Sequence, residues 1–324
     1  MPYSQGGAIL RADLAGVVEE AFLQSELYIG TKVLTPMPVP NRAGQYPKIA
    51  INGGNLLRNE VKSRGPGANY PRVQRAWTND NYTCEEYGLE SIVPDDNARD
   101  LSRFFDVASS EIRWDVRQVQ LAHEVRTAAA VFNTSTFNLS TSATAYTDAN
   151  LTTFDIGYDV DGMKQQIQSR GESVDGLTLV MSLPVFLRAR QSTRLQNRIR
   201  GTVSTDTQLT LSAQAMADAL QVKEVLIGRA TYDTSKQGAS SSSLSSIWSN
   251  TYLWLGRCDA PSGPEAYFNG STGFTIFWQQ DADLFQVETY REENIRSTIV
   301  RARQYVSEKI VLSTGAQLLA SQYS

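Results

Sequence analysis

Histidine is nearly absent from this chain of 324 residues, which contains one. His123 is followed by Glu124, but no second histidine stands at the spacing that a zinc-binding helix requires. A nucleophilic site that combines Ser or Cys with His would have to be built around this single residue. We therefore expect no metal site, no cofactor and no catalytic residues, and we interpret His123 as structural or solvent-facing.

Cysteines and long hydrophobic runs are also scarce. Cys84 and Cys258 are too few for a disulfide framework or a metal cluster, so we expect two reduced thiols. No run of about 18 apolar residues occurs, and the first residues, MPYSQGGAILRADL, lack the pattern of a secretory signal. The chain is therefore expected neither to span a membrane nor to be secreted by that route.

A strong net charge is missing as well. Lys plus Arg number 30 and Asp plus Glu 34, which gives a formal charge of −4. Such a balance offers no net attraction to phosphates and argues against dedicated nucleic-acid binding. With 41% hydrophobic and 20% charged residues, the composition is that of a globular protein, and the length allows two lobes that each have a core.

Proline and glycine are concentrated between Pro36 and Pro71, where they exclude helix over most of the segment. Two extended runs remain, residues 45–51 and 56–62, separated by the turn-forming Asn-Gly-Gly-Asn of residues 52–55. We predict a projecting two-stranded hairpin that lies on a neighbouring subunit, because an isolated ribbon is marginally stable. Charged residues alternate along it and would share one strand face, where they could set the register between subunits; they are Arg58, Glu60, Lys62 and Arg64.

Apolar residues at helical spacing predict a helix over residues 10–29 and a much longer one from Asn97 to Phe132. The long helix contains no Gly or Pro and would be a rod of about 50 Å. We interpret it as the spine of a flat domain. A half-buried strand over residues 81–93 precedes it, and the Thr-, Ser- and Asn-rich residues 133–153 are interpreted as a linker.

The rest of the chain alternates helices and strands. We predict helices over residues 159–170, after Ser182 and over 213–220. Strands are predicted over residues 177–182, 224–230, 252–256, 274–278, 285–290, 297–306 and 309–312. The order indicates a mixed α/β lobe inserted into a first domain.

The one basic cluster lies in the predicted helix after Ser182. Arg190, Arg194 and Arg198 would form a stripe along one helix face. A subunit interface or a solvated face is favoured over DNA contact, and all three interpretations stay open. The adjacent acids Asp95–Asp96 and Glu85–Glu86 are interpreted as caps and solvated turns rather than as a glycosidase or magnesium site.

The order of elements resembles the major capsid proteins of tailed phages, whose fold was first described in the Hong Kong 97 phage. Three stretches are similar to one branch of these proteins: PDDNAR at 94–99, LVMSLPVF at 179–186 and VLIGRATY at 225–232. The resemblance implies an α+β Hong Kong 97 phage-type capsid fold. Its parts would be an N-terminal arm (1–36), an extended loop (37–78), a peripheral domain with the spine helix (79–154 and 275–324) and an inserted axial domain (155–274).

The resemblance also implies a function. The chain would be a non-enzymatic subunit that assembles in the host cytoplasm, as pentamers and hexamers, into the icosahedral capsid of a virion. It would enclose double-stranded DNA by confinement rather than by specific binding. Implied partners are other copies of the chain, a separate scaffolding protein, a portal and a decoration protein. Two alternatives stay open: an encapsulin-like nanocompartment with an inner pocket for a cargo peptide, and an α/β enzyme whose hairpin is a dimerisation arm.

Overall fold

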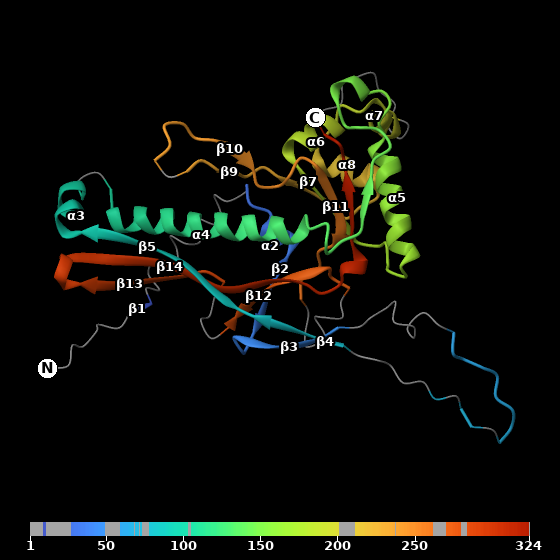
Figure 1. The fold of residues 1–324 in the computed structure, drawn as a ribbon, viewed down its shortest axis with the longest axis horizontal. Coiled ribbons are helices and arrows are strands. Elements are labelled where there is room, and N and C mark those ends of the chain that lie inside the picture. The colour runs from blue at the N-terminus through green and yellow to red at the C-terminus, as the bar shows by residue number, and fades with distance from the viewer. Residues whose placement is uncertain are drawn as a thin grey trace.

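A computed structural model describes residues 9–10, 27–48, 59–67, 69–70, 72, 78–102, 105–200, 211–236, 238–261, 270–279 and 284–323. Two main β-sheets and one long helix organise these residues (Figure 1). The first sheet lies below the long helix, and the second stands near the helix's C-terminal end.

The first sheet is built around the long strand β14 (Ser297–Ile310). One side of β14 pairs antiparallel with β5 (Glu85–Pro94). The other side pairs antiparallel with two further strands, and the sheet continues beyond each of them. The strand order is β1 (Ile9–Leu10), β13 (Gln286–Glu292), β14, β12 (Gly273–Trp278) and β2 (Thr35–Val39).

The helix α4 (Val107–Val131) covers one face of the first sheet. Ile112, Val116 and Val119 recur every three or four residues, so they share one helix face, and they pack in one cluster with Val300 and Ala302 of β14. The helix begins at Asp106, whose Oδ1 accepts a hydrogen bond from the amide of Ala108 at 3.2 Å. A shorter helix, α3 (Asp95–Leu101), precedes it.

The second sheet is covered on both faces. Its strand order is β6 (Leu139–Thr141), β15 (Gln317–Ala320), β11 (Tyr252–Arg257), β7 (Leu177–Ser182) and β8 (Glu224–Gly228). The associated helices are α5 (Ile156–Ser169), α6 (Leu183–Ala189), α7 (Thr193–Arg200) and α8 (Ala213–Leu220). Every residue of β7 is buried, as expected of a strand with packing on both sides.

The C-terminal end of α4 joins two lobes, the first built on the sheet around β14 and the second on the sheet that contains β7. Ala128 and Val131 pack in one cluster with Trp248, Trp254 and Leu318, which belong to the second lobe. The same helix therefore contributes its first half to the core of one sheet and its last turns to the core of the other, so α4 fixes the relative position of both.

The remaining elements are short. The segment α2 (Gly30–Val33) precedes β2, and two small ribbons pair β3 (Ala43–Lys48) with β4 (Thr78–Thr83) and β9 (Thr231–Asp233) with β10 (Leu244–Ser246). Single turns of 3₁₀ helix cover Asp148–Asn150, Glu293–Ile295 and Ser313–Gly315. No described helix is long and apolar enough to cross a membrane.

Several predicted elements are wrong in extent. The long helix is interrupted: α3 ends at Leu101 and α4 begins at Val107, because Asp106 caps a new helix although no Gly or Pro intervenes. The two predicted strands over residues 297–312 are the single strand β14. Most of the predicted helix over residues 10–29 lies outside the described residues, and Leu10 belongs to β1.

Two strands of the second sheet come from outside the segment predicted to form it. β6 pairs parallel with β15, and β15 pairs antiparallel with β11. Both β6 and β15 fall in segments that the sequence assigned to the peripheral domain. The boundaries of the predicted domains stay a prediction, and the sheet itself combines residues from both.

Candidate assembly surfaces

The projecting segment begins and ends on the β3–β4 ribbon. Lys48 pairs with Thr78, so residues 49–77 connect the far ends of the two strands. The predicted pairing of residues 45–51 with 56–62 is wrong at its base, since β3 pairs with β4 and residues 59–62 form no strand. Tyr46 of β3 and Tyr82 of β4 are buried in one cluster, so this packing favours the longer connection over a local turn.

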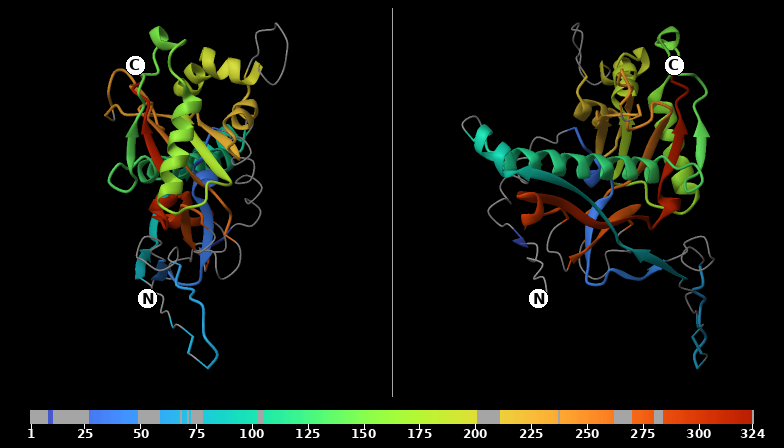
Figure 2. Two further views of the ribbon diagram at one scale, coloured as in Figure 1. Left: turned by 90° about the vertical axis from the view of Figure 1, so that its right-hand side faces the viewer. Right: turned by 60° about the vertical axis from the view of Figure 1, so that its left-hand side comes forward.

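The described tip of this segment is exposed. Residues 59–67 extend away from both sheets in every view (Figures 1 and 2). Val61 is 88% exposed, and the guanidinium of Arg64 lies 4.4 Å from the centre of the Tyr70 ring. Glu60 and Lys62 also lie here, whereas Arg58 lies outside the described residues. Residues 59–67 form no strand within this chain, so their charged side chains are not arranged on one strand face here. The predicted contacts of these side chains with a second subunit stay a prediction.

The predicted arginine stripe is split between two helices. Arg190 follows the end of α6, and α7 begins at Thr193, so only Arg194 and Arg198 share a helix. The break coincides with the buried Ser192, whose hydroxyl donates to the carbonyl of Phe154 at 3.0 Å. Arg198 Nη2 donates to Asp161 Oδ2 at 3.2 Å, and Arg194 Nη1 lies 4.0 Å from Asp155 Oδ2. Part of the basic surface is therefore directed at α5 of the same chain.

A polar pocket of about 250 Å³ lies beside Arg194. Asp159 is one of its lining residues, and Asp159 Oδ2 accepts hydrogen bonds from the hydroxyls of Ser142 and Tyr146, each at 2.7 Å. Burial raises the pKa of Asp159 above its usual range, an effect these hydrogen bonds oppose. These bonds tie the segment before α5 to that helix. Asp159 therefore has a structural role in this pocket.

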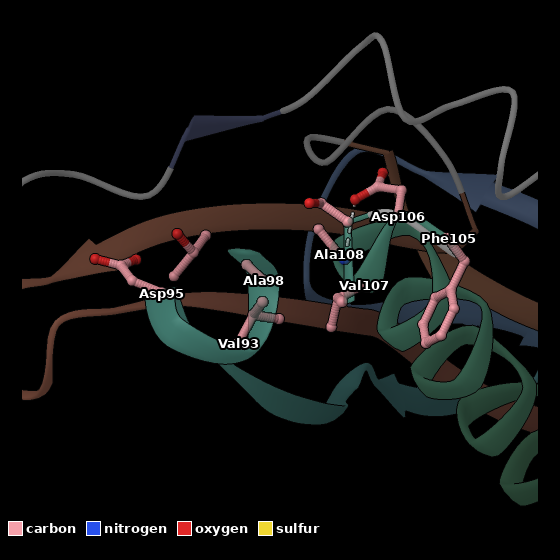
Figure 3. Close-up of a pocket in the computed structure, with 9 residues that line it drawn as sticks. Val93, Asp95, Ala98, Phe105, Asp106, Val107 and Ala108 are labelled. Carbon is pink, nitrogen blue, oxygen red and sulfur yellow. Dashed lines mark hydrogen bonds between the residues drawn. The ribbon is translucent and has the colours of Figure 1, made fainter. Parts of the chain in front are cut away.

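A second pocket, of about 360 Å³, lies where α3 meets α4 (Figure 3). Val93, Ala98 and Val107 give it apolar walls, and two carboxylates stand at its rim. Asp95 accepts two hydrogen bonds from Arg291, at 2.6 and 2.7 Å, and this contact lowers the pKa of Asp95. Asp106 caps α4, as described above. Both acids are therefore engaged in holding the fold. Asp95 does so through Arg291 and not as the predicted cap, since α3 begins at Asp95 without a side-chain capping hydrogen bond.

A row of charged side chains crosses the first sheet on the face opposite α4. Arg301 Nη1 lies 3.5 Å from Glu288 Oε2 and its Nε donates to Glu90, while Arg303 Nε donates to Glu288 Oε1 at 3.0 Å. Glu86 Oε1 lies 4.0 Å from Arg303 Nη1. The row joins β5, β14 and β13. No local sequence pattern predicts this row, because it depends on strand pairing between distant segments.

Glu124 is a buried carboxylate that joins three parts of the chain. Its Oε1 accepts from the amide of Ile29 at 2.9 Å and from Trp248 Nε1 at 2.6 Å, and its Oε2 accepts from the amide of Gly30 at 2.7 Å. A Cβ at Gly30 would lie 2.6 Å from Oε2, so glycine is needed for this close approach. Burial raises the pKa of Glu124, while the three hydrogen bonds favour its ionised form.

His123 is buried and structural. Its Nε2 lies 3.2 Å from Thr275 Oγ1, and burial lowers the pKa of the imidazole to about 3, so the ring is neutral at physiological pH. Cys84 and Cys258 are free thiols in this structure. No group of three or more His, Cys, Asp or Glu residues in the described ranges is placed to hold a metal ion.

Comparison with known proteins identifies the fold. No family model matches the sequence, and no curated protein matches it significantly. Among solved structures, a phage-related protein from Bordetella bronchiseptica is similar over 98% of both chains, with 21% sequence identity and a TM-score of 0.71. A chain from the capsid of the cyanophage P-SCSP1u has 10% identity and a TM-score of 0.58, and the match covers 92% of this chain and 88% of that one.

An encapsulin chain has a similar fold. A chain of the holo-encapsulin complex from Synechococcus elongatus has 9% identity and a TM-score of 0.53, over 93% of this chain and 87% of that one. The chain described here thus has the Hong Kong 97 phage-type capsid fold, which confirms the predicted α+β fold and the resemblance to phage capsid proteins. The fold is common to a phage capsid and an encapsulin.

Proposed function

We propose that this chain is the subunit of a closed protein shell, the capsid of a virus, and that it acts by packing against copies of itself. The observation that supports this most is the fold, which matches those of capsid proteins over nearly the whole chain. The exposed segment 59–67 supports it as well, since a projecting apolar and charged segment is stabilised when it lies on a neighbour. The role is structural: the buried acids and the histidine described above serve the fold.

Double-stranded DNA is the proposed content of the shell. A formal charge of −4 suits a container that confines DNA without holding it tightly, because tight phosphate contacts would oppose packaging and release. Pentamers and hexamers of the chain would form an icosahedral shell in the host cytoplasm and become the virion capsid. A separate scaffolding protein, a portal and a decoration protein are the further proposed partners.

Expression of the chain alone and with a candidate scaffolding protein, followed by electron microscopy, tests the shell function. Closed icosahedral particles are the expected result. A stable monomer or dimer under every condition, with scaffold present, would contradict it and favour an enzyme with a dimerisation arm.

An encapsulin-like nanocompartment is the second candidate, favoured by the similarity to the Synechococcus elongatus encapsulin. The content of particles purified from a natural source separates the two. Nuclease-protected double-stranded DNA supports a capsid, whereas a co-purifying enzyme bound to the inner wall through a short peptide supports a nanocompartment.

A further inference from the structure

The strand β5 has an unpaired edge. It pairs with β14 along its whole length, from Glu85 opposite Val306 to Pro94 opposite Ser297, and no described residue pairs with its other side. Its 10 residues, at about 3.3 Å each, present a row of peptide groups about 33 Å long. An open edge of this length is a template for one more strand.

The two faces of β5 differ in chemistry. Ser91 and Val93 face α4, since the Ser91 hydroxyl donates to Asp115 at 2.7 Å and Val93 lies in the core below the helix. Leu89 shares this face and remains 40% exposed. Glu86 and Glu90 lie on the opposite face, separated by Gly88.

Among the described residues, the charged row on that opposite face has one more negative than positive side chain. Its three carboxylates are Glu86, Glu90 and Glu288, and its two guanidiniums are Arg301 and Arg303. Glu86 and Glu90 are both more than two-fifths exposed and stand nearest the open edge. A strand that bound there with a net positive charge on this face would be favoured.

The projecting tip of this same chain offers such a strand. In an extended conformation Val61 and Ser63 would lie on one face and Glu60, Lys62 and Arg64 on the other, with a net charge of +1. Val61 is the most exposed large hydrophobic side chain among the described residues. The tip points away from its own β5 in both views of Figure 2.

We propose that residues 59–64 of one copy add as a strand to the open edge of β5 in a second copy. Val61 then lies on the side of Leu89 and Ser91, and Lys62 and Arg64 lie on the side of Glu86 and Glu90. The period of two places the apolar side chains and the charged side chains of the added strand on the matching faces of β5 together. This inference rests on the proposed shell function, because the two copies meet in the assembled particle.

Paired cysteines test the contact directly. We would introduce Val61→Cys with Leu89→Cys, and separately Val61→Cys with Ser91→Cys, and analyse oxidised particles on a denaturing gel without reductant. Disulfide-linked dimers and higher oligomers are expected in at least one pair. The matched control is Val61→Cys with Ile92→Cys, which places the second thiol on the other face of β5 and should give no ladder. Particles of the single variant Val61→Cys show how much disulfide forms between this new thiol and the native Cys84 and Cys258.

A charge exchange gives an independent test. Replacing both Lys62 and Arg64 by Glu should lower the yield of closed particles, and adding Glu86→Lys to that variant should restore part of it. Circular dichroism on unassembled chains checks that each variant folds.

The outcomes separate this inference from the proposed function. Closed particles without a ladder in either cysteine pair, or with an equal ladder in the Ile92 control, overturn the strand contact and leave the shell function standing. A wild-type chain that forms no closed particle overturns both.

Discussion

Glu124 holds together three segments that are distant in the sequence: the entrance to α2, the helix α4 and the loop that carries Trp248. Because the carboxylate is buried and accepts from three donors, its removal leaves three polar N–H groups without acceptors in a dry environment. We expect Glu124→Ala to lower the free energy of unfolding by about 3 kcal/mol or more. Glu124→Gln, which keeps one oxygen acceptor, should cost less. Urea denaturation of the unassembled chain measures both, and equal losses would contradict the account.

Asp115 makes stability depend on pH. Burial raises the pKa of this carboxyl to about 6 in the folded chain, above the value of 3.8 usual for aspartate. The folded state therefore keeps a proton that the unfolded state releases, and stability falls as pH rises from about 4 through 6. Asp115→Asn should stabilise the chain by about 1–3 kcal/mol at pH 8 and have little effect at pH 4.

Denaturation curves at the two pH values measure this difference. Asp96→Asn, on the outer surface of α3, is the control and should change little at either pH. A stabilisation by Asp115→Asn that was the same at pH 4 and pH 8 would show that the charge of Asp115 is not its cause.

At the scale of elements, Asp106 separates α3 from α4. Its Oδ1 accepts from the Ala108 amide and its Oδ2 from the Ser109 hydroxyl, so the carboxylate starts a new helix. We expect Asp106→Ala to destabilise the chain by about 1 kcal/mol, and Asp106→Asn, which still caps, by less. Thermal unfolding of the two variants measures this, and no loss in Asp106→Ala would show that the cap is dispensable.

The sequence predicts elements best where packing and local pattern agree. The strand Leu177–Ser182 and the helix Ala213–Leu220 have the predicted bounds, because a short apolar run and a helical period are both retained in the buried core. The interruption before Val107 was missed since the apolar spacing continues across it and only a cap marks the break. The pairing of β3 was missed because burial of Tyr46 and Tyr82 outweighs a local turn signal.

The candidate contact surfaces were less predictable than the fold. The alternation of Glu60, Lys62 and Arg64 predicts a subunit contact, and this stays a prediction. The partner surface proposed on β5 depends on the pairing of β5 with β14 across about 200 residues of sequence. Arg190, Arg194 and Arg198 were predicted on one helix, and the buried Ser192 divides them. Side-chain hydrogen bonds of this kind are not visible in hydrophobic periodicity.

At the scale of the whole molecule, the charge balance predicts weak contact with DNA. With a formal charge of −4, the unassembled chain should not shift double-stranded DNA in a gel at physiological salt. The comparison sample is the variant Asp148→Lys/Asp161→Lys, which adds positive charge near Arg188 and Arg198 and should bind more DNA. Tight, salt-sensitive binding by the wild-type chain would contradict a role by confinement.

Self-assembly is the central claim, and one measurement tests it most directly. Electron microscopy of the purified chain, alone and with a candidate scaffolding protein, should show closed icosahedral particles whose subunits match the structure described here, with segment 59–67 lying on a neighbouring copy. A population that stays monomeric or dimeric in all conditions would contradict the account.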